Sequence, residues 1–277
     1  MLAKPAVWTD PAVDWSRADA VVIRSTWDYP LHHSEFIEWC RKAADSTVLY
    51  NPLEMVLWNT DKRYMADLQE AVPVVDTYFV SGTEQEAVTA AIESALIHRA
   101  KSEHPEFVVK PTVSAGSKST GRFGSADIDA ALVLANDIAQ TGREVMVQPY
   151  FDSVDSNGET GLVFFNGEFS HAFEKGPILA PHHVGSDHAE HGMFALERIG
   201  PRAATPDEKS LASEVIDFVT DRFGDVPLYA RVDLLRGHSG GPVLLELELT
   251  EPSWFLATDP SAPDRAARAI RSRLAVS

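Results

Sequence analysis

Acidic side chains share one face of a hairpin that is predicted near the end of the chain. Two runs rich in Val, Leu and Tyr within residues 228–249 flank a Gly-Gly-Pro stretch, a pattern typical of antiparallel strands joined by a turn. A symmetric hairpin places Asp233 opposite Glu246 and Arg231 opposite Glu248. Like charges that face each other destabilise a sheet. Because hard cations take carboxylate oxygens together with substrate phosphates, these three carboxylates are candidate ligands for Mg²⁺ or Mn²⁺.

The alternative is a hairpin whose charged face meets water, which is common for an isolated amphipathic hairpin. The metal interpretation therefore depends on basic groups upstream. Lys110 ends an apolar strand predicted at 107–111 and precedes a Ser- and Gly-rich loop, 112–124. A lysine in this place can reach a phosphate while the loop amides surround it. Lys62 is predicted in the first turn of a helix capped by Asn59-Thr60-Asp61, where the helix dipole disfavours a cation unless an anion is nearby. The P-loop order is absent, and each lysine alone is typical of a protein surface.

The elements that must position these groups alternate along the chain. Strands are predicted at 20–23, 47–52, 73–80, 107–111 and 144–151, and helices at 34–44, 61–71, 84–99, 127–140, 206–223 and 263–274. Asn166-Gly167 predicts the tight turn of a further hairpin over 161–175. Interleaved helices and strands with hairpins in the second half indicate an α+β (mixed α/β) protein rather than a purely parallel sheet.

Composition excludes several classes of protein. The chain of 277 residues carries a formal net charge of −17, which argues against binding to nucleic acid or to an anionic membrane surface. Cys40 is the single cysteine, so no intrachain disulfide forms and a reducing cytoplasm fits best. We see no secretory signal and no apolar run long enough to cross a bilayer.

The order of these features resembles the ATP-grasp superfamily. A lysine before a helix, a lysine before a Gly/Ser loop, the strand-to-linker VMVQPY, a hairpin and a final D…E-x-E hairpin follow one another over roughly residues 55–255. The wording of VVKPTVSAGSKSTGRF, LVFFNGEFSHAFEK and YARVDLL…LLELELTEPSWFL resembles the glutathione-synthetase-like branch, and there the cyclo-ligase of D-cycloserine biosynthesis and its relatives. The resemblance implies two α+β lobes that grip ATP.

The resemblance also implies a division into domains. A truncated α/β N-terminal domain would span 1–54, the small lobe with its flexible lid 55–145, and the C-terminal lobe with the metal site 146–277. Compared with the superfamily, we expect about one βα unit to be missing or rudimentary at the N-terminus.

Roles for individual residues follow from the same resemblance. Lys62 and Lys110 would contact ATP phosphates under a lid that includes Ser114, Gly116 and Ser117. Met146, Val147, Gln148 and Tyr150 would form the hinge beside adenine, and Asp155 or Asp152 would hold the ribose. Asp233, Glu246 and Glu248 would bind one or two Mg²⁺, while Arg231 would face the transferred phosphate.

Two departures from the superfamily pattern affect the expected site. The usual Glu-x-Asn metal pair is Glu246-x-Glu248 here, which leaves Glu251 as a fallback ligand. An Arg that is frequent in the first strand after the hinge is absent at Glu159-Thr160-Gly161, and we expect Lys175 to supply this charge.

Other clusters carry weaker predictions. Arg24, Trp27, Asp28 and Tyr29 follow the first predicted strand and are candidate substrate contacts, because Arg24 and Asp28 could pair with an amino-acid-like zwitterion. Four histidines within 182–191 are more typical of a plain loop than of a zinc site, because cysteine partners and metal-site spacing are missing.

The function implied is an ATP- and Mg²⁺-dependent ligase. It would activate an amino-acid-like carboxylate as an acyl phosphate, which an amine or similar nucleophile then attacks, with ring closure within one molecule as one form. The alternatives are a nucleotide-binding protein of the same fold without turnover, and a metal-binding protein that uses the histidine loop. A homodimer stays open.

Overall fold

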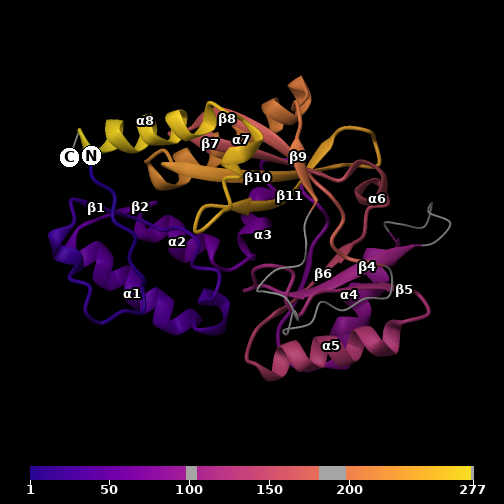
Figure 1. Ribbon diagram of the computed structural model, residues 1–277. Helices are drawn as coiled ribbons and strands as arrows, with labels where there is room; N and C mark the ends of the chain where they lie inside the picture. Colours follow the sequence, from indigo (N-terminus) through magenta and orange to yellow (C-terminus); the bar gives the residue numbers. More distant parts are fainter. Residues whose placement is uncertain (98–104, 181–197, 276–277) are drawn as a thin grey trace.

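Three sheets organise the computed structural model, which describes residues 1–97, 105–180 and 198–275 (Figure 1). The first sheet pairs β1 (Ala20–Val22) with β2 (Val48–Tyr50) in parallel. The second has the order β3-β6-β4-β5, and the third the order β11-β10-β7-β8-β9. All pairs in the second and third sheets are antiparallel. This confirms the expected mixture of helices with hairpin-rich sheets.

The N-terminal segment packs around helix α1 (His33–Ser46). Phe36, Cys40 and Ala43 recur on one face of α1 at helical spacing and are fully buried, in a core shared with Ile23 after β1. Two short 3-10 turns, η1 (Trp15–Arg17) and η2 (Tyr29–Leu31), precede α1. Because β1 and β2 are parallel, α1 is the crossover between them, and the chain leaves β2 for helix α2 (Leu53–Asn59).

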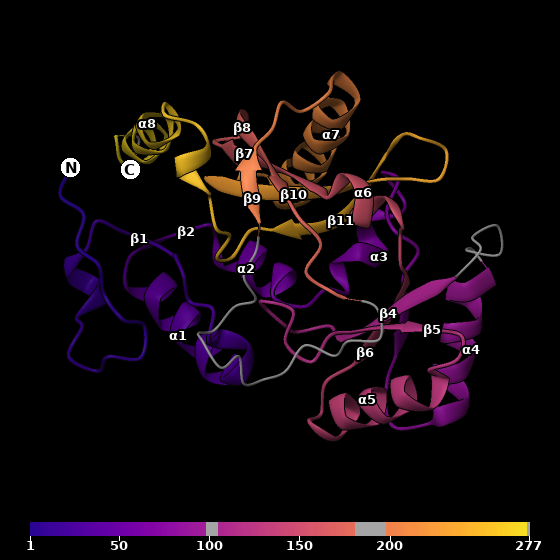
Figure 2. The same cartoon turned by 45° about the vertical axis from the view of Figure 1, so that its right-hand side comes forward.

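The second sheet forms a small lobe with two helices. It contains β3 (Tyr78–Val80), β4 (Glu106–Pro111), β5 (Gly121–Gly124) and β6 (Val145–Pro149). Helices α4 (Gln85–Ile97) and α5 (Ile128–Gln140) lie along the same side of these strands in Figures 1 and 2. Their apolar faces meet the strands in one core, so the opposite face of the sheet is left to the cavity described below.

The third sheet is the larger one. It contains β7 (Glu159–Phe165), β8 (Glu168–Lys175), β9 (Ile199–Pro201), β10 (Tyr229–Arg236) and β11 (Pro242–Glu248). Asn166 and Gly167 both have positive φ and form the predicted turn between β7 and β8. Helix α7 (Pro206–Phe223) begins at a capping box of Thr205 and Glu208. It packs on the face that presents Ala230, Val232 and Leu234.

The opposite face of β10 carries the polar residues. Tyr229 packs there with Trp254 and with helix α8 (Ala262–Leu274), and Arg231 and Asp233 follow at alternate positions. The 3-10 turn η3 (Leu256–Thr258) joins this end of the sheet to α8. Short helices α3 (Tyr64–Leu68) and α6 (Ser153–Asn157) complete the elements.

Strand β6 packs into both lobes. Its residue Met146 lies in the core of the large sheet, with Leu162 and Ala230. Its neighbours Val145 and Val147 point the other way into the core of the small lobe. The two cores therefore meet at β6 and at its partner β3, where Phe79 packs on the large-sheet core and Val80 lies in the small-lobe core.

Several element boundaries differ from the prediction. Asn59 does not cap a helix that contains Lys62: it ends α2, and α3 begins only at Tyr64. Its amide side chain is instead bonded to β11, since Nδ2 donates to the Leu247 carbonyl at 2.8 Å and Oδ1 accepts from the Leu249 N–H at 2.6 Å. A tertiary contact thus replaces the local cap.

The loop expected at 112–124 also ends in a strand, β5, and the strand expected at 73–80 is regular only from Tyr78. Elements α2, α6 and β9 were not predicted. The domain boundaries stay predictions; residues Met55, Tyr64 and Leu68 pack into the core of the large sheet. Among the described residues, the helices are all too short or too polar to traverse a bilayer.

Candidate active site

The pairing of β10 with β11 confirms the predicted register at the charged residues. Arg231 lies opposite Glu248, and Asp233 lies opposite Glu246. Toward the turn the register shifts, because Leu234 pairs with Leu244 and leaves Leu245 as an extra residue. This bulge lets Leu244 and Leu247 both reach the buried core, although strict alternation would put residues three apart on opposite faces. Leu245 and Glu246 consequently both face the cavity.

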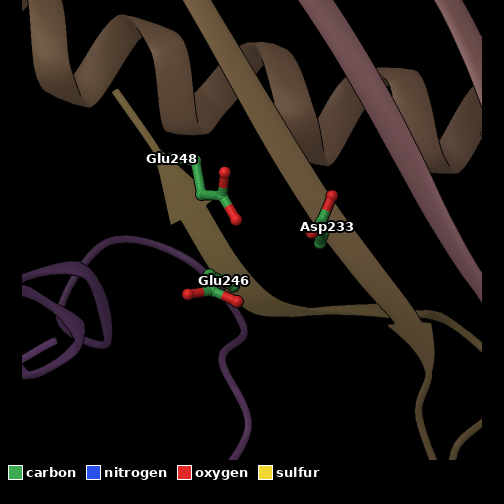
Figure 3. Close-up of side chains that lie close together, drawn as sticks. All are labelled: Asp233, Glu246 and Glu248. Atoms are coloured by element: carbon green, nitrogen blue, oxygen red, sulfur yellow. The ribbon is translucent and has the colours of Figure 1, made fainter. Parts of the chain in front are cut away.

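Three carboxylates converge on this face. Figure 3 shows Glu246 and Glu248 on one strand and Asp233 on its neighbour. Each offers an oxygen within 4.8 Å of the others. Among the described residues this is the one group of at least three potential metal ligands so close together. Mg²⁺ and Mn²⁺ prefer hard oxygen ligands, so these carboxylates from two strands fit the expected metal.

Arg231 is the counter-charge of this cluster. Its Nη2 donates to Asp233 Oδ2 at 2.8 Å and also to Glu248, and its Nε donates to Asp233 Oδ1 at 2.9 Å. Arg231 is 5% exposed and Asp233 1%. Against the effect of burial, Asp233 and Glu248 raise the pKa of Arg231. Burial raises the pKa of Glu248 to about 7, with Arg231 opposing. The guanidinium therefore stays charged and stands in for the positive charge that the carboxylates require.

Lys62 links the predicted lid to the cluster of three carboxylates. Its Nζ donates to the Ser114 carbonyl at 2.8 Å and to Ser114 Oγ at 3.2 Å, and lies 3.2 Å from Glu246 Oε1. The backbone N–H of Lys62 donates to the Thr112 carbonyl at 2.9 Å. Burial alone would raise the pKa of Glu246, but Lys62 and Lys110 outweigh it and lower this pKa to about 2.

Lys110 reaches the same space from the small lobe. It sits on β4, where it pairs with Met146 of β6. Burial lowers the pKa of Lys110 to about 8, with Glu246 opposing and Lys62 reinforcing the shift. Its side chain has no hydrogen bond or ion pair within the described part of the chain. A lysine that is buried in this way is prepared for an anionic ligand.

A cavity of about 400 Å³ lies between the lobes, beside this carboxylate cluster. The charged residues in its wall are Lys62, Lys110, Glu159, Lys175, Arg231, Glu246, Glu248 and Glu251. Ser114, Gly116 and Ser117 of the predicted lid lie there too, with Gln148 and Tyr150 of the predicted hinge. The structure thus brings together groups from both lobes that are far apart in the sequence.

Glu159 and Lys175 face each other across β7 and β8. The two residues are a direct strand pair, and Lys175 Nζ lies 3.4 Å from Glu159 Oε2. Burial raises the pKa of Glu159, while Lys175 opposes the rise. Lys175 therefore lies in the cavity wall. It is paired there with Glu159, which was not predicted to be a site residue.

The predicted hinge divides into two parts. Met146 and Val147 are buried in the two cores and are not in the cavity wall. Gln148 and Tyr150 are in the wall, and Gln148 Nε2 donates to Thr77 Oγ1 at 2.9 Å. Met146 and Val147 thus pack in the two cores, whereas Gln148 and Tyr150, at the end of β6, line the cavity.

Asp155, expected at the ribose, is engaged by protein groups. Its carboxylate accepts from Arg122 Nη1 at 3.0 Å, from Arg122 Nη2 at 2.8 Å and from the Tyr150 hydroxyl at 2.7 Å. Arg122 also binds Glu106 and lies over the Tyr150 ring, 3.6 Å from its centroid. Asp155 is not among the residues in the cavity wall. The predicted ribose contact is therefore not in place in this structure.

The four expected substrate contacts also separate. Trp27 and Tyr29 line the cavity. Arg24 does not: it donates to the Pro252 carbonyl at 2.6 Å and lies over the Trp254 ring, 3.5 Å from its centroid. Asp28 accepts from Trp8 Nε1 at 3.1 Å and is likewise outside the wall. The zwitterion pairing expected of Arg24 and Asp28 is thus not supported, because Arg24 joins the N-terminal segment to residues 252–254 and Asp28 is bonded within that segment.

Some wall residues carried no sequence signal. Tyr64 lines the cavity and its hydroxyl accepts the Leu247 N–H at 2.9 Å. Asn59 holds the same edge strand, as described above. Both belong to a segment that looked like an ordinary amphipathic helix. The histidines of 182–191 lie outside the described residues.

The family match and the sequence relative agree with each other. Residues 1–51 match a family described as the N-terminal domain of D-cycloserine synthetase DcsG. The cycloserine biosynthesis protein DcsG of Streptomyces lavendulae is 38% identical over 270 residues, which cover 96% of this chain and 87% of that protein.

Solved structures agree. The crystal structure of D-cycloserine synthetase DcsG superposes with a TM-score of 0.84 at 36% identity, over 96% of this chain and 88% of that one. D-alanyl-alanine synthetase A from Vibrio cholerae gives a TM-score of 0.61 at 16% identity, over 93% and 77%. The ATP-grasp ligase PsnB, in complex with a minimal precursor, Mg and ADP, gives 0.55 at 17% identity, over 92% and 79%. The last two likenesses show the fold alone.

Proposed function

This chain belongs to the DcsG family of ATP-grasp ligases, and from that premise we propose that it joins a carboxylate to a nucleophile through an acyl phosphate, at the expense of ATP. It is an enzyme of the ligase class. The single observation that carries the proposal is the convergence of Lys62, Lys110, Glu246 and Glu248 on one cavity, with Asp233 beside the two glutamates.

Two lysines of the cavity wall, Lys62 and Lys110, would bind the triphosphate. Lys110 approaches from the small lobe, and Lys62, between α2 and α3, contacts both Ser114 of the lid and Glu246 of the carboxylate cluster. Phosphoryl transfer depends mainly on positioning and on stabilisation of charge, so no nucleophilic side chain is required. Asp233, Glu246 and Glu248 would hold Mg²⁺, which when bound neutralises charge on the phosphates.

The proposed reaction has two steps. A substrate carboxylate oxygen attacks the γ-phosphorus, the bond to the β,γ-bridging oxygen breaks, and ADP leaves. The nucleophile then attacks the acyl carbon, and inorganic phosphate leaves while the nucleophile loses a proton. Arg231, held by Asp233 and Glu248, would orient the acyl phosphate. Ring closure within an amino-acid-like substrate is the form of this reaction that the likeness to DcsG favours.

A coupled screen tests the proposal. The protein is incubated with ATP, Mg²⁺ and a library of amino-acid-like carboxylic acids, and ADP, phosphate and product mass are measured together. We expect ADP and phosphate in equal amounts with a product that has lost water. Stabilisation by nucleotide without ADP release for any compound would instead identify a nucleotide-binding protein of the same fold.

Lys110→Ala supplies the matched variant. It should abolish the rise in melting temperature that ATP and Mg²⁺ give to the wild type, because the lysine from the small lobe is lost from the triphosphate. Val133→Ala, at an exposed position on α5, should keep that rise. An unchanged rise in Lys110→Ala would remove Lys110 from the nucleotide site.

A further inference from the structure

Glu251 is a buried carboxylate in the cavity wall that the proposed chemistry does not use. It lies three residues beyond the end of β11 and is 7% exposed. The sequence suggested it as a fallback metal ligand, but the close group of carboxylates comprises Asp233, Glu246 and Glu248 without it. Its role must therefore come from the ligand it faces.

The charges of the wall are otherwise almost fully paired. Lys62 lies beside Glu246, Lys175 beside Glu159, and Arg231 beside Glu248. Within the described residues the remaining charged side chains of the wall, Lys110 and Glu251, have no hydrogen bond or ion pair. Lys110 is assigned above to the triphosphate. Burial disfavours a charge on the remaining carboxylate, and neither ATP nor the three-carboxylate cluster supplies a cation that would offset this cost.

Two aromatic residues share the cavity wall with Glu251. Trp27 Nε1 donates to the backbone carbonyl of Glu251 at 3.3 Å. Glu251 is also the strongest charge acting on Tyr29, whose pKa is raised by burial and then by this carboxylate. Trp27 and Tyr29 both line the cavity. A carboxylate beside aromatic rings is the combination that binds organic ammonium groups.

We propose that Glu251, together with Trp27 and Tyr29, binds the ammonium group of the substrate, so that this ligase selects carboxylic acids that carry a protonated amine. The inference rests on the proposed ligase function and deepens it. Burial and then Glu248 raise the pKa of Glu251 in the ligand-free chain. A bound ammonium would supply the compensating charge that favours the ionised carboxylate.

One consequence concerns the nucleophile. A protonated nitrogen has no lone pair, so an ammonium held by Glu251 is a recognition group rather than the attacking atom. The nucleophile is then a different group, on the same molecule or on a second one.

The test compares Glu251→Gln with the wild type. The probes are the amino acid that gives the fastest ADP release in the screen, its desamino counterpart and its N-acetyl counterpart. We expect the wild type to show an apparent KM at least about tenfold lower for the amine than for either counterpart, as an interaction with a desolvated charge would give. In Glu251→Gln this preference should disappear through a rise in KM, with kcat changed much less.

The controls separate the possible failures. Glu54→Gln, at an exposed position on α2, should leave the preference intact, and Glu251→Asp, which keeps the charge, should retain part of it. Stabilisation by ATP and Mg²⁺ should be unchanged in Glu251→Gln, which also reports that the variant is folded. Turnover without preference for the amine, or a preference that survives in Glu251→Gln, would overturn this inference alone. Nucleotide stabilisation with no turnover of any carboxylic acid would overturn the ligase function and the inference with it.

Discussion

The ammonium group of Lys110 is buried beside the carboxylate cluster, and its protonation should control nucleotide affinity. Burial lowers its pKa to about 8 in the ligand-free protein. A bound triphosphate favours the charged form and so raises this pKa. Because ATP binds the protonated form more tightly, affinity should fall above about pH 8, by roughly tenfold per pH unit until the pKa of the complex is reached.

Calorimetric titration with a non-hydrolysable ATP analogue and Mg²⁺ between about pH 7 and pH 9.5 checks this prediction. Lys110→Arg, whose guanidinium stays charged throughout this range, should bind with a flat profile. A wild-type profile that is equally flat would show that Lys110 is not the titrating group.

Residues with strong charge patterns were predictable, and residues with tertiary roles were not. Arg231, Asp233, Glu246 and Glu248 were placed correctly because strand alternation and a short turn determine which side chains pair. Asn59 was misplaced as a helix cap, because an amide that bonds a distant strand edge looks the same in sequence as one that bonds its own helix. Glu159 was read as a departure from a family pattern, and its partnership with Lys175 needed the register of β7 with β8.

At the scale of elements, close packing of an aromatic ring leaves room only for glycine at position 161 of β7. Gly161 on β7 pairs directly with Phe173 on β8. A Cβ atom at Gly161 would lie 2.1 Å from the Phe173 ring. The ring thus covers the glycine, and any side chain there would displace it.

Gly161→Ala should therefore lower the free energy of unfolding by about 1–3 kcal/mol, the usual range for overpacking a core. Gly200→Ala in β9 is the matched control, because a Cβ atom there meets nothing within 4 Å. Urea denaturation of both variants measures the difference. Equal stabilities for the two would contradict the close packing of Phe173 on Gly161.

Most long elements were predictable at this scale, and the short ones were not. Helices α5 and α7 begin and end close to the predicted bounds because apolar spacing defines both, and a capping box also marks the start of α7. Elements α6 and β9 are five and three residues long, which is too short for a periodic pattern. The bulge at Leu245 was also missed, since Leu244 and Leu245 are both apolar and nothing in the sequence marks one of them as the extra residue.

For the whole molecule, strand β6 should make the two lobes unfold together. Met146 is 1% exposed in the core of the large sheet, while Val145 and Val147 are buried in the core of the small lobe. Loss of either core would expose the strand that the other needs. Differential scanning calorimetry should show one transition for the two lobes.

Met146→Ala should lower stability by about 2–5 kcal/mol, as expected for a cavity at a buried methionine, and should shift that single transition as a whole. Val133→Ala, on the exposed side of α5, should leave it in place. Two resolved transitions, only one of which moves in Met146→Ala, would show that the lobes are independent.

The internal ion pairs of the cavity wall also bear on what the protein ignores. Lys62, Lys175 and Arg231 already lie beside carboxylates. To bind these three residues, a small anion such as orthophosphate or acetate would have to separate the pairs while bringing nothing for the carboxylates that it leaves behind, so only Lys110, among the described residues of the wall, is left to attract it. A polyphosphate chelated to a divalent ion brings substitutes for both sides at once. Discrimination against abundant small anions would then arise from the resting state itself, as an exchange of partners that only a ligand carrying both signs of charge can complete.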